Sequence, residues 1–197
     1  LTDNPGNRKI ICKRGTKYPE RKMNTSKTST SLMYCGNAAG EVLPPFIVYK
    51  AKNVWSLWTE GGPKGARYDC TPSGWFDGRT FEEWFDSLML PALRKQEGKK
   101  IVIGDNLSSH ISENVIEKCK ETNTAFICLP PNSTHLCQPL DVAFFGPMKK
   151  KWRALLTDWK RKGKKNSVMT KDVFPKQLRK LHDAMQENQA ANLMSGF

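Results

Sequence analysis

The feature that most constrains the fold of this chain is a strand, a helix and a second strand in close succession over residues 99–129. The apolar runs in "KKIVIGD" and "TAFICLPP" predict two short buried strands, and the sequence between them predicts a helix over about 113–121 that is capped by Ser112. Two strands connected through a helix run parallel, so their carboxyl ends meet at one edge of the sheet. The sequence therefore predicts an α/β fold.

An aspartate directly follows the first of these strands. Asp105 ends "IVIGD". The segment "LPPNSTHLCQPL" starts at the same edge, where the second strand ends, and Asp141 follows it and opens a helical pattern. Ligands of open α/β sheets bind at this edge. Two neighbouring carboxylates repel each other unless a cation lies between them, and Mg²⁺ prefers such oxygen ligands. The two aspartates therefore indicate a magnesium site suited to phosphodiester chemistry.

Each of these residues also has a purely structural interpretation. Asp105 alone can form a turn, Asp141 can be the N-cap of the helix that follows it, and His110 can be a hydrogen-bonded structural histidine.

The six cysteines give little evidence of disulfides, because a chain of 197 residues can bury a core without them. We expect reduced thiols. A structural zinc site is an alternative, but the chain has no CxxC pair, so that site would be assembled from Cys128, His135 and Cys137.

The chain is strongly basic, with 32 Lys and Arg against 19 Asp and Glu and a net charge of +13. This balance favours a polyanion as partner, and an acidic membrane surface is the competing one. No apolar run approaches the roughly 18 residues of a membrane span, so we expect no membrane partner. Residues 8–27 hold eight basic residues and residues 149–165 hold nine, although either stretch can be an ordinary solvated face. The residues predicted to contact nucleic acid are Lys13, Arg14, Lys149, Lys150, Lys151 and Arg153.

The amino-terminal half predicts further strands. "KIICKR" is compatible with a short strand, and "STSLMYCGNAAGEVLPPFIVYK" predicts a hairpin with a longer loop. Pro44 and Pro45 place the second arm of this hairpin at a sheet edge. Residues 53–78 mix Gly, Pro and Trp without a period and are predicted to be irregular.

Three helices are predicted from apolar spacing. The first starts with a capping box at Thr80 and Glu83 and ends or kinks at Pro91. Its buried face is predicted to contain Phe81, Trp84, Phe85, Leu88 and Ala92. The second begins near Asp141, with an irregular first turn because of Pro147, and buries Phe145, Met148, Trp152, Leu156 and Trp159. The third covers 174–187 and buries Phe174, Leu178, Leu181 and Met185.

Two motifs resemble those of a known family. "GDNLSSHIS" followed by "LPPNSTHLCQPLDVAFFGPMKKKW" closely resembles the DDE-superfamily endonuclease domain of pogo/Tigger-type transposases, which include jerky-like proteins and relatives of centromere protein B. The resemblance continues upstream through "GNAAGEVLPPFIVYK" and "SGWFDGRTFEEWF" and covers nearly the whole chain. It implies an RNase H-like fold, a mixed central sheet flanked by helices, with residues 1–165 as the catalytic core and 166–197 as a helical extension of the same domain.

The resemblance also implies a reaction. In this family three acids bind two divalent ions, Mg²⁺ or Mn²⁺, and the enzyme cuts DNA strands and joins the freed 3′ end to a target. Matched motif by motif, Asp105 is the second acid and Asp141 the third. The implied partners are double-stranded DNA of transposon ends and target, with a homodimer in the synaptic complex, and the implied location is the nucleus.

The first acid of the family belongs to an Asp-Glu-Thr/Ser motif on the first strand, shortly before a segment similar to "LTDNPGNRKIICKRG". Asp3 lies in "TDNPG" and lacks this motif, so we do not assign it. We expect the chain to be the catalytic core of a longer transposase-like protein whose first strand is incomplete here.

Three functions follow as hypotheses. The first is a metal-dependent DNA endonuclease and strand transferase core of a transposase. The second is a transposon-derived host protein that keeps the fold for DNA binding or as a scaffold and no longer cuts. The third is a cellular RNase H-like nuclease acting on an RNA-containing substrate, which the family motifs disfavour.

Overall fold

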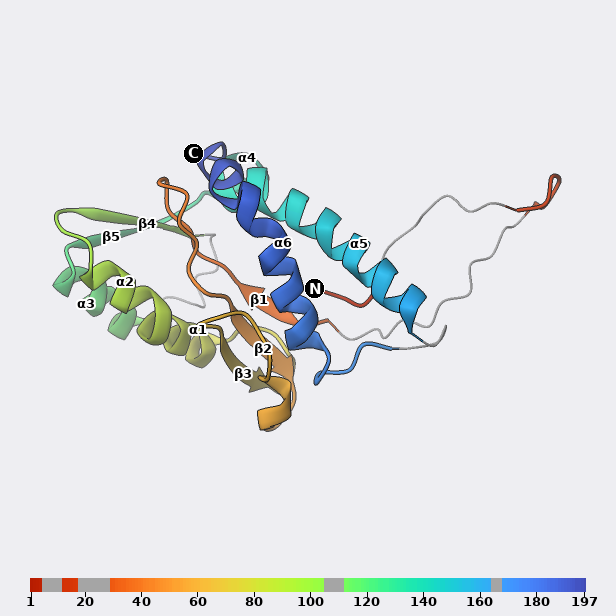
Figure 1. Ribbon diagram of the computed structural model, residues 1–197. Coiled ribbons are helices and arrows are strands. Elements are labelled where there is room, and N and C mark those ends of the chain that lie inside the picture. Colours follow the sequence, from red (N-terminus) through yellow and green to blue (C-terminus); the bar gives the residue numbers. More distant parts are fainter. Residues whose placement is uncertain (5–11, 18–28, 105–111, 164–167) are drawn as a thin grey trace.

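The structure of the chain is a computed structural model, which describes residues 1–4, 12–17, 29–104, 112–163 and 168–197 (Figure 1). These residues form two small β-sheets flanked by helices, which confirms the predicted α/β class. No helix in this part of the chain is both long and apolar enough to cross a membrane. Half of the strand predicted at "KIICKR", residues 9–11, falls outside the described residues, and residues 12–14 are not in a strand.

The first sheet has three strands in the order β1 (Ser31–Met33), β2 (Phe46–Lys50) and β3 (Arg67–Thr71). β1 and β2 pair antiparallel, which confirms the predicted hairpin. The prediction that its second arm lies at a sheet edge is wrong, because β2 also pairs with β3 and is the central strand. Pro44 and Pro45 are tolerated because they precede the strand, and the Pro45 carbonyl accepts the N–H of Arg67.

The prediction that residues 53–78 are irregular is wrong in part, because a short 3-10 helix, η1 (Ser56–Trp58), and β3 lie there. β3 has the sequence "RYDCT", and only Thr71 within it is buried. Such a segment has no apolar alternation to identify it. It becomes a strand because it pairs in parallel with β2, which is a tertiary contact.

A continuous helical segment follows, made of α1 (Gly78–Trp84), the π-helical η2 (Phe85–Met89) and α2 (Leu90–Arg94). Its capping box is one turn earlier than predicted: the Asp77 carboxylate accepts the Thr80 N–H at 2.9 Å, and the Asp77 N–H donates to the Thr80 hydroxyl at 2.8 Å. Pro91 does not end the helix. The π-helical turns directly before it widen the helix where the proline lacks an N–H.

The second sheet consists of β4 (Lys100–Gly104) and β5 (Thr124–Cys128), which pair in parallel on either side of α3 (Glu113–Glu121) in the chain. The predicted strand–helix–strand unit is confirmed, and the Ser112 hydroxyl accepts the Val115 N–H as its N-cap. The prediction that both strands are buried is wrong for one face. Val102 is in the core, whereas Ile101, Ile103 and Ile127 are exposed.

The carboxyl-terminal part is helical, with α4 (Thr134–Cys137), the π-helical η4 (Leu140–Phe144), α5 (Phe145–Lys162) and α6 (Phe174–Met194). Most of the predicted apolar positions of the last two helices are buried, namely Met148, Trp152, Leu156, Phe174, Leu178, Leu181 and Met185. The turns before α5 are irregular, as expected for the segment ahead of Pro147.

The central strand β2 divides the core into two layers. Phe46 and Val48 pack with α1, η2, α2 and α3, whereas Ile47 and Tyr49 pack with η4, α5 and α6. Figure 1 shows the first sheet between α1 on one side and α5 and α6 on the other. Because β2 alternates between two apolar layers, all four of these side chains are completely or almost completely buried.

Candidate active site

The carboxyl ends of β4 and β5 lie side by side, as the sequence predicted. Gly104 and Cys128 are partners in the strand register, and the Leu129 N–H donates to the Gly104 carbonyl at 2.9 Å. Asp105 follows Gly104 in the chain but lies outside the described residues, as does His110. The role of Asp105 therefore stays a prediction, and the structure fixes the sheet edge from which the chain reaches it.

Asp141 lies in η4, directly before α5, and is exposed. Pro139 is the N-cap of η4 and Phe144 that of α5, so the alternative interpretation of Asp141 as a helix cap is wrong. Its carboxylate makes no hydrogen bond or ion pair with any residue that the structure describes. The flanking Leu140 and Phe144 pack into the core beside α5 and α6, so this carboxylate extends into solvent from a well-anchored backbone.

The segment that connects β5 to Asp141 is compact. The Ser133 hydroxyl donates to the Pro130 carbonyl at 2.7 Å, and α4 follows at once. The end of α6 packs against the start of η4, since a Cβ added to Gly196 would lie 2.6 Å from the Pro139 carbonyl oxygen. Figure 1 shows the carboxyl terminus beside α4. Contacts at both ends thus hold the position of Asp141 relative to β5.

The side chains in this region decide which of the predicted metals, Zn²⁺ or Mg²⁺ and Mn²⁺, fits the site. Within the described part of the chain, no three His, Cys, Asp or Glu side chains form a group that could hold a metal ion. Cys128, His135 and Cys137 are all described, so the zinc alternative is wrong, and the cysteines are free thiols. The exposed, unengaged carboxylate of Asp141 fits Mg²⁺ or Mn²⁺, which are held by one or two carboxylates, and Asp105 remains the predicted second one.

Asp3, which was not assigned to the site, is engaged elsewhere. Its carboxylate lies 3.8 Å from the Lys160 ammonium, and the two residues are only 4% and 7% exposed. A buried carboxylate paired with a buried lysine is not available to a solvent-facing metal site. Leaving Asp3 out of the acid triad therefore agrees with the structure.

Residues 1–3 run antiparallel to residues 29–30. The Leu1 amino group donates to the Thr30 carbonyl at 2.6 Å, and the Thr30 N–H donates to the Leu1 carbonyl at 2.8 Å. The Trp152 indole N–H donates to the Thr2 carbonyl at 2.8 Å and attaches this segment to α5.

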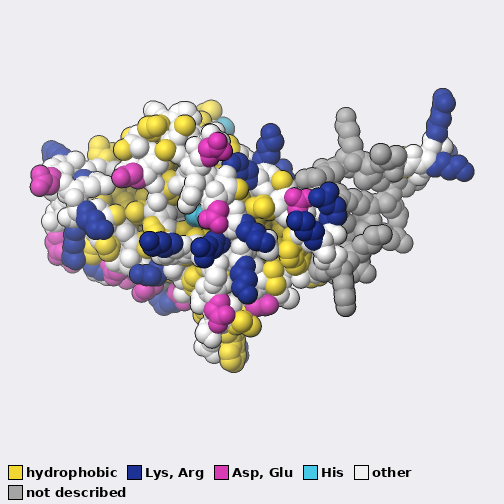
Figure 2. Space-filling view, viewed as in Figure 1, with side chains coloured by type: hydrophobic (Ala, Val, Ile, Leu, Met, Phe, Trp, Pro, Cys, Tyr) yellow, Lys and Arg dark blue, Asp and Glu magenta, His cyan; other side chains and the backbone are white. Residues whose placement is uncertain are grey.

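The predicted DNA-contacting residues of α5 do not act as one group. Lys149, Lys150 and Arg153 are exposed, and the Lys149 ammonium lies 5.9 Å from the centre of the Phe145 ring. The ammonium of the half-buried Lys151 donates to the carbonyl of Ala184 on α6. Figure 2 shows Lys and Arg side chains over α5 and α6 with single acidic side chains between them. Lys151 therefore connects two helices, while its neighbours face solvent.

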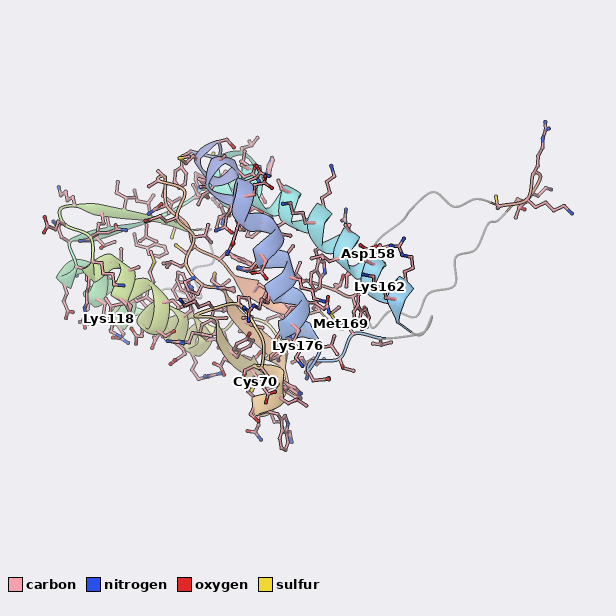
Figure 3. The ribbon with its side chains drawn as sticks, viewed as in Figure 1. Cys70, Lys118, Asp158, Lys162, Met169 and Lys176 are labelled. Carbon is pink, nitrogen blue, oxygen red and sulfur yellow. The ribbon has the colours of Figure 1, made fainter. Side chains whose placement is uncertain are left out.

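Two other basic regions lie outside this part of α5. Lys13 and Arg14 are exposed in a turn closed by the Thr16 hydroxyl, which donates to the Lys13 carbonyl at 2.7 Å. At the carboxyl end of α5, Arg161 pairs with Asp158 at 3.0 Å, and Figure 3 shows Asp158 and Lys162 near this end.

A comparison with sequence models of protein families identifies the chain. The model of the DDE superfamily endonuclease matches residues 26–195. The chain belongs to the DDE superfamily of endonucleases. This membership confirms the resemblance found in the sequence, and the fold of this DDE endonuclease domain is of the RNase H-like class.

Relatives of this DDE domain occur in longer proteins. It is 26% identical over 161 residues to the "Pogo transposable element with KRAB domain" of Homo sapiens, and the same holds for the protein of that name from Mus musculus. These matches cover 80% of the chain and 24% of each relative. It is also 34% identical over 116 residues to the "MFS-type transporter clz9" of Cochliobolus lunatus, covering 58% of the chain and 13% of that protein. No solved structure matches the chain.

The DDE domain differs from the expected single central sheet. Its described strands form two sheets, and β1 is an edge strand of the first, while β4 pairs only with β5. Each of these two strands therefore has one edge that no described strand pairs.

Sequence reasoning missed the buried Lys160. The signal was present, because Met148, Trp152, Leu156 and Lys160 follow one another at intervals of four on α5. A lysine that continues an apolar stripe requires a buried partner, and that partner is Asp3.

Proposed function

We propose that this DDE domain is the catalytic core of a transposase that cuts DNA strands and joins the freed 3′ ends to target DNA in the nucleus. The observation that carries the proposal is the pairing of β4 with β5, because Gly104, the residue before Asp105, is the register partner of Cys128, after which the segment bearing Asp141 begins. The family match over residues 26–195 supports the same reaction class.

Asp105 and Asp141 would hold two Mg²⁺ or Mn²⁺ ions, which when bound activate the attacking oxygen and stabilise the leaving oxygen. The role of the chain is to fix these carboxylates on rigid elements. The solvent-facing position of Asp141, ahead of the 18-residue helix α5, suits this role because incoming DNA can reach it. In cutting, water attacks a phosphodiester, whose P–O3′ bond breaks to give a 3′ hydroxyl and a 5′ phosphate; in joining, that 3′ hydroxyl attacks a target phosphodiester and displaces the 3′ hydroxyl of the target strand.

The first acid of the triad would come from a strand upstream of Leu1 in a longer protein. Leu1 and Thr30 exchange two backbone hydrogen bonds, as residues of an antiparallel strand pair do. Residues preceding Leu1 that continued this pairing would run along the edge of β1 that is unpaired among the described strands.

Double-stranded DNA would contact the exposed basic residues of α5, Lys149, Lys150 and Arg153, together with Lys13 and Arg14. Phosphate contacts of this kind position a duplex without reading its sequence. Recognition of both transposon ends would require two copies of the chain in one synaptic complex.

The alternative function is a transposon-derived host protein that binds DNA or other proteins without cutting. One observation supports this alternative. The human and mouse relatives are named as a pogo transposable element with a KRAB domain, and the match covers only 24% of each. A DDE domain can thus be part of a protein with a further domain.

Nicking of supercoiled plasmid DNA in Mg²⁺ tests the proposal. A longer protein that includes the native upstream strand should nick the plasmid, and Asp105→Ala or Asp141→Ala in that protein should abolish nicking while DNA binding persists. Asp158→Ala is the matched control, because Asp158 is exposed on α5 and already paired with Arg161. A longer protein that binds DNA and Mg²⁺ but never nicks would support the host-protein alternative.

A further inference from the structure

Two loops at one end of the first sheet carry exposed tryptophans. β2 ends at Lys50 and β3 ends at Thr71, and these two residues are register partners. Trp55 lies in the loop after β2 and Trp75 in the loop after β3, and each is 65% exposed. Large aromatic side chains that are exposed in two loops leaving the same end of paired strands favour an interaction surface.

The two loops are packed against each other where they leave the sheet. The Ala51 N–H donates to the Thr71 carbonyl at 3.0 Å, and the Thr71 hydroxyl donates to the Trp75 carbonyl at 2.9 Å. Gly74, with a φ of +80°, lies so close to Lys50 that an added Cβ would come within 2.8 Å of the lysine Cβ. The backbone on either side of both exposed indoles is therefore held in place.

The loop after β2 is also fixed from the α6 side. The Lys171 ammonium donates to the Lys50 carbonyl at 2.6 Å and lies 4.4 Å from the centre of the Trp58 ring. The Tyr49 hydroxyl donates to the Trp58 carbonyl at 3.0 Å. Trp58 thus anchors η1, and Trp55 projects from a rigid base. Figure 2 shows hydrophobic side chains protruding at the bottom of the molecule, where Figure 1 draws η1.

Cations are present at the base of this surface. Lys50 and Lys52 are exposed, and neither forms an ion pair with a residue in the described part of the chain. Residues 51–77 contain three acids. Asp69 forms a 2.8 Å ion pair with Arg79, Asp77 is the N-cap of α1, and Glu60 is exposed. The lysines next to the two indoles therefore remain available to an anion.

We propose that Trp55 and Trp75, with Lys50 and Lys52, form a binding site for unpaired nucleotides. Flat indole faces bind bases by stacking, which every base permits, and the neighbouring ammonium groups contact the phosphates. A strand in a duplex hides its base faces in the stack, so this surface fits a single-stranded segment. The site requires neither Asp105, Asp141 nor a metal ion and goes beyond the proposed nuclease function.

The test compares two labelled oligonucleotides of equal length and charge, one of thymidines and one of abasic residues, by fluorescence anisotropy without divalent ions. The chain should bind the thymidine strand about tenfold more tightly or better, because stacking on an aromatic residue contributes this much per base. Trp55→Ala/Trp75→Ala should bind both strands with nearly equal affinity, and Trp55→Phe/Trp75→Phe should keep most of the preference.

Two controls separate stacking from other effects. Leu57→Ala removes an exposed aliphatic side chain from the same loop and should leave the preference unchanged. Lys149→Glu/Lys150→Glu should weaken binding of the thymidine strand and of the abasic strand alike. The ratio of the two affinities should therefore not depend on the proposed DNA contacts of α5. The proposal is overturned if the unmodified chain shows no preference for bases, if the double alanine variant retains it, or if Leu57→Ala abolishes it, which would show that the preference depends on this aliphatic side chain and not on stacking against the indoles.

Discussion

The Lys160 ammonium on α5 lies 3.8 Å from the Asp3 carboxylate, and both side chains are almost completely buried. Removing one partner of a buried pair leaves the other charge uncompensated. We predict that Lys160→Met lowers the free energy of unfolding by about 3–5 kcal/mol.

Urea denaturation measures this loss. The double variant Asp3→Asn/Lys160→Met should be more stable than Lys160→Met alone, because the buried carboxylate is then gone. Arg161→Met is the control, since the exposed pair of Arg161 with Asp158 contributes about 1 kcal/mol or less. Equal effects of Lys160→Met and Arg161→Met would contradict the pairing.

The basic residues of α5 should separate into two classes. Lys149→Glu/Lys150→Glu should reduce the salt dependence of duplex DNA binding by about 0.9 units of log K per log salt for each lost phosphate contact. Lys151→Met should instead lower stability, because it removes the hydrogen bond to Ala184, and should change the slope less. The measurement is duplex affinity over a salt series without Mg²⁺. A slope unaffected by the double reversal would show that this part of α5 is a solvated face.

His182 on α6 should make the fold acid-sensitive. Its Nε2 lies 2.9 Å from the Tyr34 hydroxyl, and burial lowers its pKa below the ordinary value of 6.5, although Asp183 acts in the opposite direction. The unfolded chain therefore takes up the proton more readily than the folded one. The contribution of His182 to the free energy of unfolding is fully present above the ordinary pKa of histidine. It is lost as the pH falls through the lower pKa of the folded state.

Between about pH 7.5 and about pH 5, the free energy of unfolding should thus fall less in His182→Gln than in the unmodified chain. Denaturation at the two pH values measures this difference. His135→Gln should decline like the unmodified chain, because His135 is exposed on α4. An identical decline in the His182 variant would exclude this histidine as the source.

Asp77 should be the cap that stabilises α1. Its carboxylate accepts the Thr80 N–H, and this hydrogen bond is the main reason that its pKa is lowered. Asp77→Ala should destabilise the protein by about 1 kcal/mol in urea denaturation, and Asp77→Asn by less, because an asparagine can still accept the bond. Glu83→Ala tests the capping box first inferred from the sequence and should cost little; a larger loss from Glu83→Ala than from Asp77→Ala would reverse the assignment.

The sequence predicted the elements that carry a strong local pattern. The β4–α3–β5 unit and the buried stripes of α5 and α6 follow from apolar spacing, because each places one face against the core. β3 was missed because pairing with β2, and not its own side chains, makes it a strand. The burial of β4 was overestimated because an apolar run alone does not reveal whether a second layer covers it, and none of the described elements covers Ile101 and Ile103.

The candidate site was predictable to a lesser extent. The motif predicts Asp141 as a metal ligand, which stays a prediction, and the structure adds that its backbone is fixed by Leu140 and Phe144. Sequence alone could not separate Lys151 from Lys150, because the direction of each side chain depends on where α6 packs. The partner of Lys160, Asp3, lies 157 positions away in the chain and therefore leaves no local signal.

A crystal of the protein soaked in Mn²⁺ tests the central claim most directly, through the anomalous signal of the metal. We predict that one carboxylate oxygen of Asp105 and one of Asp141 lie about 2 Å from the same ion, with a second ion roughly 3.5–4 Å from the first where both are bound. Carboxylates on opposite faces of the sheet, or Mn²⁺ bound away from both aspartates, would contradict the account.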